Sequence, residues 1–542
     1  MSTKSPDCDV IIVGAGFSGV RALWETINRG LSVTCLEAGS DVGGVWFWNR
    51  YPGARTDSEG WVYSMNFAPG MKNLWNYGER YPAQGEVQQY ISRVSDNFDL
   101  RKHIQFDTQV KSCHFNDADN TWTITTAAGK TLTCRYFIAA TGPLSIAKKL
   151  PFPGLEGFKG DWYQTSSWPK DKIDFAGKRV AIVGTGATGV QIIPKIAAVA
   201  KEVVVFQRTP NYVLPGRNYV IDSDDADRIR SNYDQTWTLA SNHPFGLPMI
   251  PSGKVLKDMK DEAEIRQMLD KSWEAGGFHM QFETFDDIFT DAESNAVVSK
   301  YLREKIHAVV EDQKTADILS PKYPFLSKRP PCGHFYYETF NKPSVKLVDI
   351  YHDEIDVNET GVRTVKAGDQ YDVDIIVFAL GFDAATGALC EMDVRGRGGQ
   401  SLKENWDKKV TSFAGALVPG FPNMFMICGP HIPFGNMPVV LDSKVEWIGK
   451  TLEYMKTQSL ASIDVKNEAV DAFLEDLNVA FKSTLFAETA EKSGAWFVGA
   501  NIPGKAKGPL FYFGGVQNWQ NWLNKESNDN WSSMIFSQPV AA

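Results

Sequence analysis

Residues 10–19 read Val-Ile-Ile-Val-Gly-Ala-Gly-Phe-Ser-Gly, which predicts a strand, a glycine-rich turn and the start of a helix. Four consecutive β-branched residues are typical of a strand buried in a parallel sheet, and the helical pattern continues to about Asn28. Gly14, Gly16 and Gly19 permit a tight turn that brings a pyrophosphate close to the amides at a helix N-terminus. We therefore expect a dinucleotide site at these three glycines.

A second predicted strand, Leu31 to Leu36, ends at Glu37, which follows Gly14 by 23 residues. A carboxylate at this spacing can accept hydrogen bonds from both ribose hydroxyls of an adenosine, and it would repel a 2′-phosphate. The site therefore suits FAD or NAD. A dinucleotide site this close to the N-terminus is usual in flavoproteins that bind two dinucleotides.

The same pattern recurs 170 residues later. Residues 179–183 predict another buried strand, and the turn that follows contains Gly184, Gly186 and Gly189. The next strand ends in Gln207-Arg208-Thr209 without an acid, and Arg208 follows Gly184 by 24 residues. A guanidinium at this spacing matches a 2′-phosphate through paired, charge-assisted hydrogen bonds, although it could also be a surface arginine at a strand end. The pattern favours NADPH over NADH.

Helical periodicity replaces the strand pattern between about Gly216 and Pro324. Residues 290–293 read as a capping box, and the apolar stripe after them predicts a helix packed on a core. Strand patterns return at 345–348 and 374–378. We therefore expect a helical insertion inside the second nucleotide-binding domain.

The bulk composition bounds the function. The chain has 542 residues, 43% of them apolar, which is enough for more than one core. Its net charge of −9 argues against nucleic acid as a partner and favours a small-molecule substrate. Residues 1–9 do not resemble a secretory signal, and no apolar run reaches membrane-spanning length, so we expect a cytoplasmic protein.

The arrangement of cysteines and histidines argues against two further classes of protein, those that depend on disulfides or a redox-active dithiol and those that bind a metal. The seven cysteines are scattered and never form a Cys-x-x-Cys pair, which argues against a disulfide framework or a redox-active dithiol. The eight histidines show no ligand spacing, and Cys332 and His334 lie close in sequence but lack companions. We predict no metal site.

Two longer motifs resemble the type I Baeyer–Villiger monooxygenases. Residues 43–57 match one family signature at every specified position, including Gly44, Trp46 and Asp57. Residues 158–169, between the two nucleotide patterns, resemble the family fingerprint. Its positions are occupied by Phe158, Gly160, Gln164, Trp168 and Pro169. Gln164 stands where the family has histidine.

The resemblance implies roles for individual residues. The family's catalytic arginine matches Arg329, and Asp57 would hold it on the reactive side of the flavin. Lys328 would join Arg208 and Thr209 around the 2′-phosphate. Residues 494–509 resemble a mobile segment that folds over the nicotinamide, with Trp496 at the nicotinamide ribose.

The resulting prediction is an α/β chain with two Rossmann-like dinucleotide-binding domains, for FAD and for NADP, and a helical insertion in the NADP domain. The expected ranges are 1–142 and 381–542 for the FAD domain, 143–175 for a linker with the fingerprint, 176–215 and 328–380 for the NADP domain, and 216–327 for the insertion.

The resemblance implies an FAD- and NADPH-dependent monooxygenase that uses O₂ to convert a ketone into an ester or lactone, with sulfoxidation as a further activity. No membrane and no obligate protein partner are expected. One alternative is a flavin monooxygenase that oxidises nitrogen or sulfur, whose fingerprint ends in Tyr instead of Trp-Pro. Another is an uncoupled NADPH oxidase or redox sensor, because an amide at Gln164 cannot carry the positive charge available to imidazole.

Overall fold

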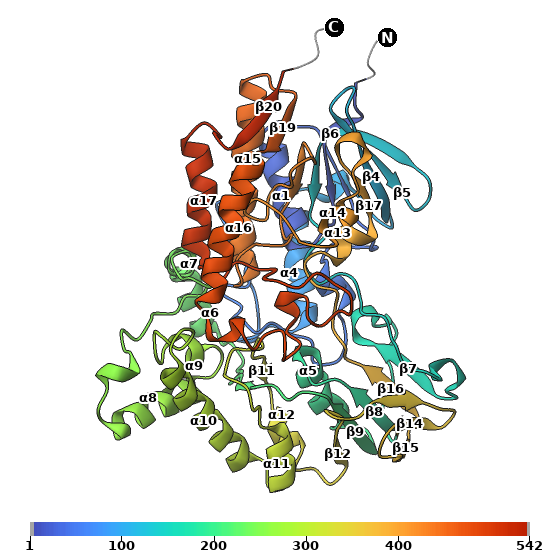
Figure 1. Ribbon diagram of the computed structural model, residues 1–542, viewed down its shortest axis with the longest axis vertical. Helices are drawn as coiled ribbons and strands as arrows, with labels where there is room; N and C mark the ends of the chain where they lie inside the picture. The colour runs from blue at the N-terminus through green and yellow to red at the C-terminus, as the bar shows by residue number, and fades with distance from the viewer. Residues whose placement is uncertain (1–4, 539–542) are drawn as a thin grey trace.

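The computed structural model describes residues 5–538, so the ends of the first and last predicted ranges, 1–4 and 539–542, lie outside the described residues. Two separate sheets dominate the structure, one in the upper half of Figure 1 and one at the lower right, with helices packed around each. This architecture confirms the predicted α/β class.

The first sheet has eight strands and mixed pairing. Its order is β17 (Asp393–Arg395), β4 (Val110–Asn116), β5 (Thr121–Thr126), β6 (Thr131–Ala139), β1 (Cys8–Val13), β2 (Val33–Leu36) and β3 (Ile104–Gln105), with β18 (Met424–Met426) paired to β6. β1 lies parallel to both β2 and β6, and helix α1 (Phe17–Asn28) follows it. The strand after α1 begins at Val33, two residues later than the apolar pattern suggested, because Leu31 belongs to the turn that leaves the helix.

The second sheet is entirely parallel. Its order is β12 (Val345–Asp349), β9 (Glu202–Gln207), β8 (Arg179–Val183), β16 (Ile375–Phe378) and β7 (Asp161–Gln164). Helix α5 (Ala187–Ile196) follows β8. Strand β7 comes from the fingerprint stretch, which the sequence analysis placed in a linker. It forms an edge strand because its backbone pairs with β16 in register, Gln164 beside Phe378.

Helices fill the chain between the short paired strands β10 (Leu214–Pro215) and β11 (Cys332–Gly333). They are α6 (Ser223–Ser231), α7 (Tyr233–Ser241), α8 (Glu262–Ala275), α9 (His279–Phe282), α10 (Ala292–Val309) and α11 (Gln313–Leu319). The predicted capping box at Thr290 is wrong. The N-cap of α10 is Asp291, whose carboxylate accepts the backbone N–H of Ser294 at 2.8 Å. A negatively charged carboxylate stabilises the positive end of the helix dipole more than a neutral hydroxyl does.

Smaller elements complete the two halves. Near the first sheet lie α2 (Val45–Trp48), α3 (Met71–Leu74), α4 (Gln84–Asn97), α13 (Gly387–Glu391) and α14 (Leu402–Trp406). The second half also holds α12 (Tyr336–Thr339) and an antiparallel sheet of β13 (Ile355–Val357), β14 (Gly361–Thr364) and β15 (Gln370–Asp372).

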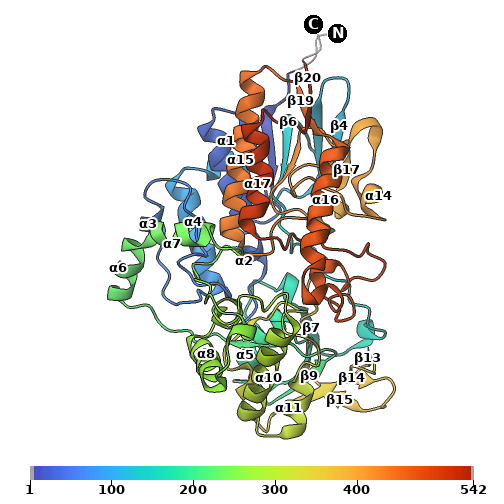
Figure 2. The ribbon, with the colours of Figure 1, turned by 60° about the vertical axis from the view of Figure 1, so that its left-hand side comes forward.

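The chain returns to the first sheet for its last third. Helices α15 (Met437–Thr457), α16 (Asn467–Lys482) and α17 (Val516–Asn528) stand beside that sheet, with α15 in contact with α1 (Figure 2). Strands β19 (Ser462–Val465) and β20 (Met534–Ser537) pair next to them. The largest apolar core spans the first sheet, these helices and much of the helical segment, while two smaller cores cover the faces of the second sheet.

Candidate functional site

The first glycine-rich turn lies at the carboxyl end of β1. A side-chain carbon at position 19 would overlap the carbonyl oxygen of Gly14, so only glycine allows α1 to approach the strand this closely. Gly16 is the N-cap of α1, and no side chain caps that end. The amides of the first helical turn are therefore available to bind an anion such as a pyrophosphate.

Glu37 follows β2 and is buried beside this turn. Its carboxylate accepts backbone N–H groups from Ala15 at 2.6 Å and Gly39 at 2.7 Å. Burial raises the pKa of this carboxyl group, and the two N–H groups oppose that shift. Each carboxylate oxygen keeps acceptor capacity for a ribose hydroxyl. The arrangement fits the adenosine half of FAD.

The signature at residues 43–57 forms the wall beside the turn. Gly44 packs against Gly16, because a side-chain carbon at position 44 would lie only 2.9 Å from the Cα atom of Gly16. The indole N–H of the buried Trp46 donates to the hydroxyl of Tyr63 at 3.2 Å. Burial raises the pKa of Tyr63 to about 12, so this hydroxyl stays neutral. Trp46 is thereby held in one orientation.

Asp57 and Arg329 meet although 272 residues separate them. Nη2 of Arg329 donates to Oδ2 of Asp57 at 2.7 Å. The Asp57 side chain is 5% exposed and that of Arg329 is 30% exposed, so the guanidinium keeps an open side that the carboxylate does not cover. Phe278, just before α9, places its ring 5.9 Å from Cζ of Arg329. Asp57 therefore fixes the direction in which the charged guanidinium of Arg329 presents its remaining N–H donors.

Two further side chains, Gln191 and Tyr51, orient Asp57. Gln191 of α5 donates from Nε2 to Oδ1 of Asp57 at 3.5 Å and to the carbonyl of Arg55 at 3.0 Å. The hydroxyl of Tyr51 donates to Oε1 of Gln191 at 2.8 Å, and burial raises the pKa of Tyr51 to about 12. Sequence reasoning missed Gln191. A polar residue between the apolar Val190 and Ile192 of α5 was the available signal.

The second glycine-rich turn repeats the geometry of the first between β8 and α5. A side-chain carbon at position 189 would overlap the carbonyl oxygen of Gly184, and Gly186 is the N-cap of α5 without a capping side chain. Among residues 5–538, no heavy atom outside Gly186 and its two chain neighbours lies within 4 Å of the position that a side-chain carbon there would take. This open space in front of helix amides fits a second pyrophosphate.

Cations gather where β9 ends. Arg208 is exposed, and within residues 5–538 it has no carboxylate in ion-pair distance; the same holds for the half-buried Lys328. Burial, and then the charge of Arg208, lowers the pKa of Lys328 to about 8. The Thr185 hydroxyl donates to the carbonyl of Thr209 at 3.3 Å, which ties this strand end to the second glycine turn. An unpaired cluster of this kind fits a 2′-phosphate.

The fingerprint residues join the second half of the molecule. A side-chain carbon at Gly160 would overlap the carbonyl oxygen of Asp374, which explains the glycine before β7. Phe158 packs against the second sheet, and Trp168 is buried against Tyr163, with Pro169 half-buried after it. Gln164 donates from Nε2 to the backbone carbonyl of Lys148 at 2.7 Å. The amide therefore makes a backbone contact at the edge of the second sheet.

The segment 494–509 lies against both halves. Trp496 contacts the rings of Phe434 and Phe511, with centroid separations of 5.8 and 5.2 Å. Lys505 forms an ion pair with Asp383 and donates to the carbonyl of Ala384 at 2.7 Å. These contacts hold the segment against residues 383–384, where the chain leaves β16 for the first sheet, and against the rings of Phe434 and Phe511.

The base of this segment reaches the residue before Lys328. The Thr489 hydroxyl donates to Oγ of Ser327 at 2.7 Å, and the Ser493 hydroxyl donates to the Ser327 carbonyl at 3.3 Å. Ser327 therefore links the base of the segment to Lys328 and Arg329, which follow it directly in the chain. Thr489 and Ser493 were not predicted, because small hydroxyl residues carry no distinctive spacing.

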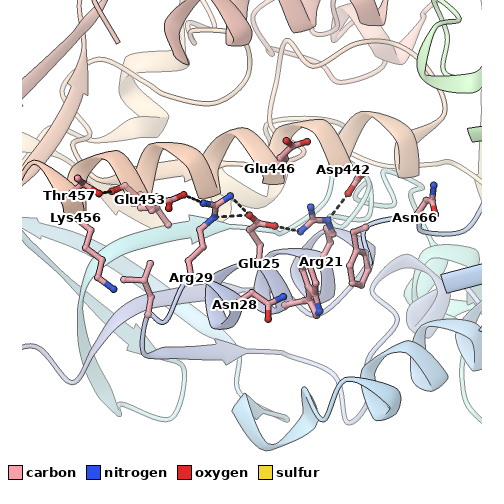
Figure 3. A pocket seen from close by; sticks show the side chains of 14 residues that line it. Arg21, Glu25, Asn28, Arg29, Asn66, Asp442, Glu446, Glu453, Lys456 and Thr457 are labelled. Atoms are coloured by element: carbon pink, nitrogen blue, oxygen red, sulfur yellow. Dashed lines mark hydrogen bonds and ion pairs between the residues drawn. The ribbon is translucent and has the colours of Figure 1, made fainter. Parts of the chain in front are cut away.

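A groove of about 880 Å³ lies between α1 and α15, and none of the predicted site residues lines it (Figure 3). Its arginines are matched to carboxylates. Arg21 pairs with Glu25 at 2.7 Å and with Asp442 at 2.6 Å, and Arg29 pairs with Glu25 and Glu453. We interpret these pairs as fastening α1, which carries the first glycine turn, to α15.

Within residues 5–538, no cluster of three or more His, Cys, Asp and Glu side chains could hold a metal ion. In the same range, no helix has the length and apolar character needed to cross a membrane. All seven cysteines are free thiols.

Comparisons with known proteins agree with this geometry. Residues 7–222 match the family described as flavin-binding monooxygenase-like. A Baeyer–Villiger monooxygenase of Pseudooceanicola batsensis is 36% identical, covering 98% of this chain and 97% of its own. A phenazine N-monooxygenase of Lysobacter antibioticus is 35% identical, covering 97% and 96%. The crystal structure of cyclohexanone monooxygenase from Rhodococcus bound to NADP⁺ superposes with a TM-score of 0.94, at 34% identity, covering 98% of this chain and 100% of that one.

The fold and the site define a flavoprotein monooxygenase with two dinucleotide-binding sites. More particularly, the chain belongs to the Baeyer–Villiger monooxygenase family. The predicted family is confirmed.

Proposed function

We propose that this protein is an FAD-dependent, NADPH-consuming monooxygenase that uses O₂ to convert ketones into esters or lactones. The observation that carries this proposal is the contact of Asp57 with Arg329. Asp57 belongs to the signature beside the first glycine turn, and Arg329 follows the helical segment of the second half. A fixed positive charge therefore lies where the two nucleotide sites approach each other.

The cofactor assignment follows from the two turns. FAD would bind at the first turn, with Gly14, Gly16 and Gly19 facing its pyrophosphate and Glu37 accepting from its ribose. NADPH would bind at the second turn, with Gly184, Gly186 and Gly189 facing its pyrophosphate. Arg208, Thr209 and Lys328 would hold its 2′-phosphate, and Trp496 would contact its nicotinamide ribose. This assignment is supported by turns whose space a side chain would fill, and by cations that have no carboxylate partner among residues 5–538.

Bound FAD, once reduced by NADPH, supplies the activation of O₂. The contribution of the protein is electrostatic. A guanidinium stays protonated at any working pH, so Arg329 can donate hydrogen bonds to negative charge that develops during oxygen transfer, without a change of its own protonation. Asp57 aims the guanidinium, and Gln191 and Tyr51 hold Asp57 in place.

The ketone would bind beside aromatic side chains. Phe434, Phe511 and Trp496 form a connected cluster, and Phe278 lies next to Arg329. Such a lining favours apolar ketones, because aromatic rings bury large apolar surfaces. The test is a panel of cyclic, linear and aryl ketones incubated with the purified yellow protein and NADPH, with products identified by mass spectrometry. Release of hydrogen peroxide alone with every ketone would contradict the proposal.

A second candidate function is oxidation of an aromatic nitrogen. It is favoured by the 35% identity to the phenazine N-monooxygenase, and the aromatic rings around Trp496 could also pack against a fused heteroaromatic ring. Adding phenazines to the panel separates the two. An N-oxide without any ester or lactone would select this function.

The proposed reaction needs a ketone, O₂ and NADPH, and no protein partner. Seven free thiols suit a reducing compartment. The proposed location is therefore the cytoplasm, which fractionation of the source cells tests directly.

Gln164→His is expected to change the coupling of NADPH oxidation to product by less than about tenfold, a barrier change under roughly 1.4 kcal/mol. Gln164 uses a neutral N–H to hold the Lys148 carbonyl, and an imidazole offers the same kind of donor. The measurement is product formed per NADPH consumed, with hydrogen peroxide release assayed in parallel. If the wild type only releases peroxide while the histidine variant makes ester, the natural protein is an uncoupled oxidase.

Binding of NADP⁺ is expected to weaken as the pH rises above about 8, whereas binding of NAD⁺ should not follow this profile. The pKa of Lys328 is lowered to about 8 by burial and by the charge of Arg208, so its ammonium is charged below that pH and neutral above it. Only NADP⁺ carries the phosphate that needs this charge. Titrations followed by flavin absorbance between pH 6.5 and 9.5 measure the dissociation constants of NADP⁺ and NAD⁺. Parallel pH profiles for the two nucleotides would contradict the assignment of Lys328.

A further inference from the structure

We propose that Lys148 is a third cationic ligand for the 2′-phosphate of NADPH, and that Gln164 is the residue that positions it. This inference rests on the proposed use of NADPH at the second glycine turn. It adds a binding residue to that site and gives the amide at position 164 a defined task.

The backbone places Lys148 at the edge where the second sheet presents its carboxyl ends. Its N–H donates to the carbonyl of Gly381 at 3.2 Å, just beyond β16, and Ala147 forms an antiparallel bridge with Phe382. Its own carbonyl accepts Nε2 of Gln164 at 2.7 Å, at the end of β7. The residue is thus held from both sides, by two neighbouring strand ends. Ligands of open α/β sheets bind at this edge.

The charge around Lys148 points to an anion. Lys148, Arg208 and Lys328 have no carboxylate within ion-pair distance among residues 5–538. Lys148 is half-buried, and burial followed by the charge of Arg208 lowers its pKa, as it does for Lys328. Both lysines therefore lie near the same guanidinium. Each lysine is repelled by Arg208, and no carboxylate among residues 5–538 pairs with any of the three to offset that repulsion, which favours a bound anion.

A phosphate monoester is the anion that this cluster fits. Arg208 lies at the spacing from which a ribose is read, and a 2′-phosphate offers three oxygens to surrounding donors. A guanidinium can bind two of them in parallel, and ammonium groups such as those of Lys328 and Lys148 act as point charges on the others. The neighbouring Lys149 is exposed and has no such environment, which makes it a matched control.

The experiment measures dissociation constants of NADP⁺ and NAD⁺ with the FAD-loaded enzyme. Lys148→Ala is expected to weaken NADP⁺ about tenfold, the loss of one hydrogen bond to a charged group, and to leave NAD⁺ within about twofold. Lys149→Ala should change neither. Lys148→Gln keeps the side-chain stem and serves if the alanine variant loses flavin. Adenosine 2′,5′-bisphosphate and inorganic phosphate, used as competitors, show whether the site requires the nucleotide or only the phosphate.

A double-mutant cycle tests the role of Gln164. Gln164→Leu should also weaken NADP⁺ selectively, and adding it to Lys148→Ala should cost little more, because the lysine it positions is already gone. If Lys148→Ala changes NADP⁺ and NAD⁺ equally, or neither, while Arg208→Ala remains selective, the role of Lys148 is wrong and the phosphate site stands. If Arg208→Ala is not selective either, the proposed NADPH site itself fails.

Discussion

Arg329→Ala is expected to leave FAD bound and reducible by NADPH and yet to abolish formation of ester or lactone. The variant keeps both glycine turns and Glu37, to which the two dinucleotides are assigned, and removes only the guanidinium charge proposed to act in oxygen transfer. Loss of one transition-state hydrogen-bond donor typically costs on the order of 10² to 10³ in rate, and loss of a full charge should cost no less. The measurements are flavin content, the rate of flavin reduction by NADPH and the yield of product.

Asp57→Ala serves as the comparison and should be milder. Arg329 keeps its charge in that variant and loses only the carboxylate that aims it, at 2.7 Å. Product yield should therefore fall less than in Arg329→Ala. If Arg329→Ala instead loses its flavin, the arginine is structural, and its assignment to oxygen transfer is wrong.

Arg208→Ala is expected to raise the Michaelis constant for NADPH about tenfold to a hundredfold and to leave that for NADH nearly unchanged. Losing a hydrogen bond to a charged group costs roughly 1.5 to 3 kcal/mol, and only NADPH carries the phosphate that Arg208 would bind. Removing this guanidinium also relieves the repulsion on Lys328, which limits the loss. Steady-state rates with each nucleotide measure the effect.

The matched control is Arg228→Ala. Arg228 is an exposed arginine of α6, and its ion pair within residues 5–538 is with Asp225, which is not assigned to a cofactor. It should leave both Michaelis constants unchanged. Equal effects of Arg208→Ala on NADPH and NADH would show that Arg208 is structural and would remove the main reason for choosing NADPH.

Local patterns were enough to predict the two glycine-rich turns. β1, α1 and β2 surround Gly14, and β8, α5 and β9 surround Gly184, as their strand and glycine patterns indicated. The periodicity of strands and helices reflects backbone geometry over a few residues, so it can be recognised in a short stretch of sequence. A position where two backbone segments approach closely requires glycine, and that glycine can also be recognised in the sequence. The same locality limited the prediction at helix ends, where Asp291 and not Thr290 caps α10.

Edges of sheets were not predictable in the same way. Residues 161–164 form strand β7 because β16 offers a free edge in register, and nothing within the fingerprint itself specifies that partner. The linker expected at 143–175 therefore contains part of the second sheet. Pairing between strands depends on segments far apart in the chain, so it is decided when those segments pack.

The sequence by itself determined the fold class, the two glycine-rich turns and the family, because each rests on residues close together in the chain. Only the tertiary structure decided which distant side chains meet. It brought Arg329 into contact with Asp57 across 272 residues, and Gln191 into contact with Asp57. It also joined Lys148 to Gln164 by a hydrogen bond and placed Lys148 within the electrostatic influence of Arg208. Charge and hydrogen bonding act over a few ångströms of space whatever the separation in sequence, so these partnerships exist only once the two sheets and the helices between them have packed together.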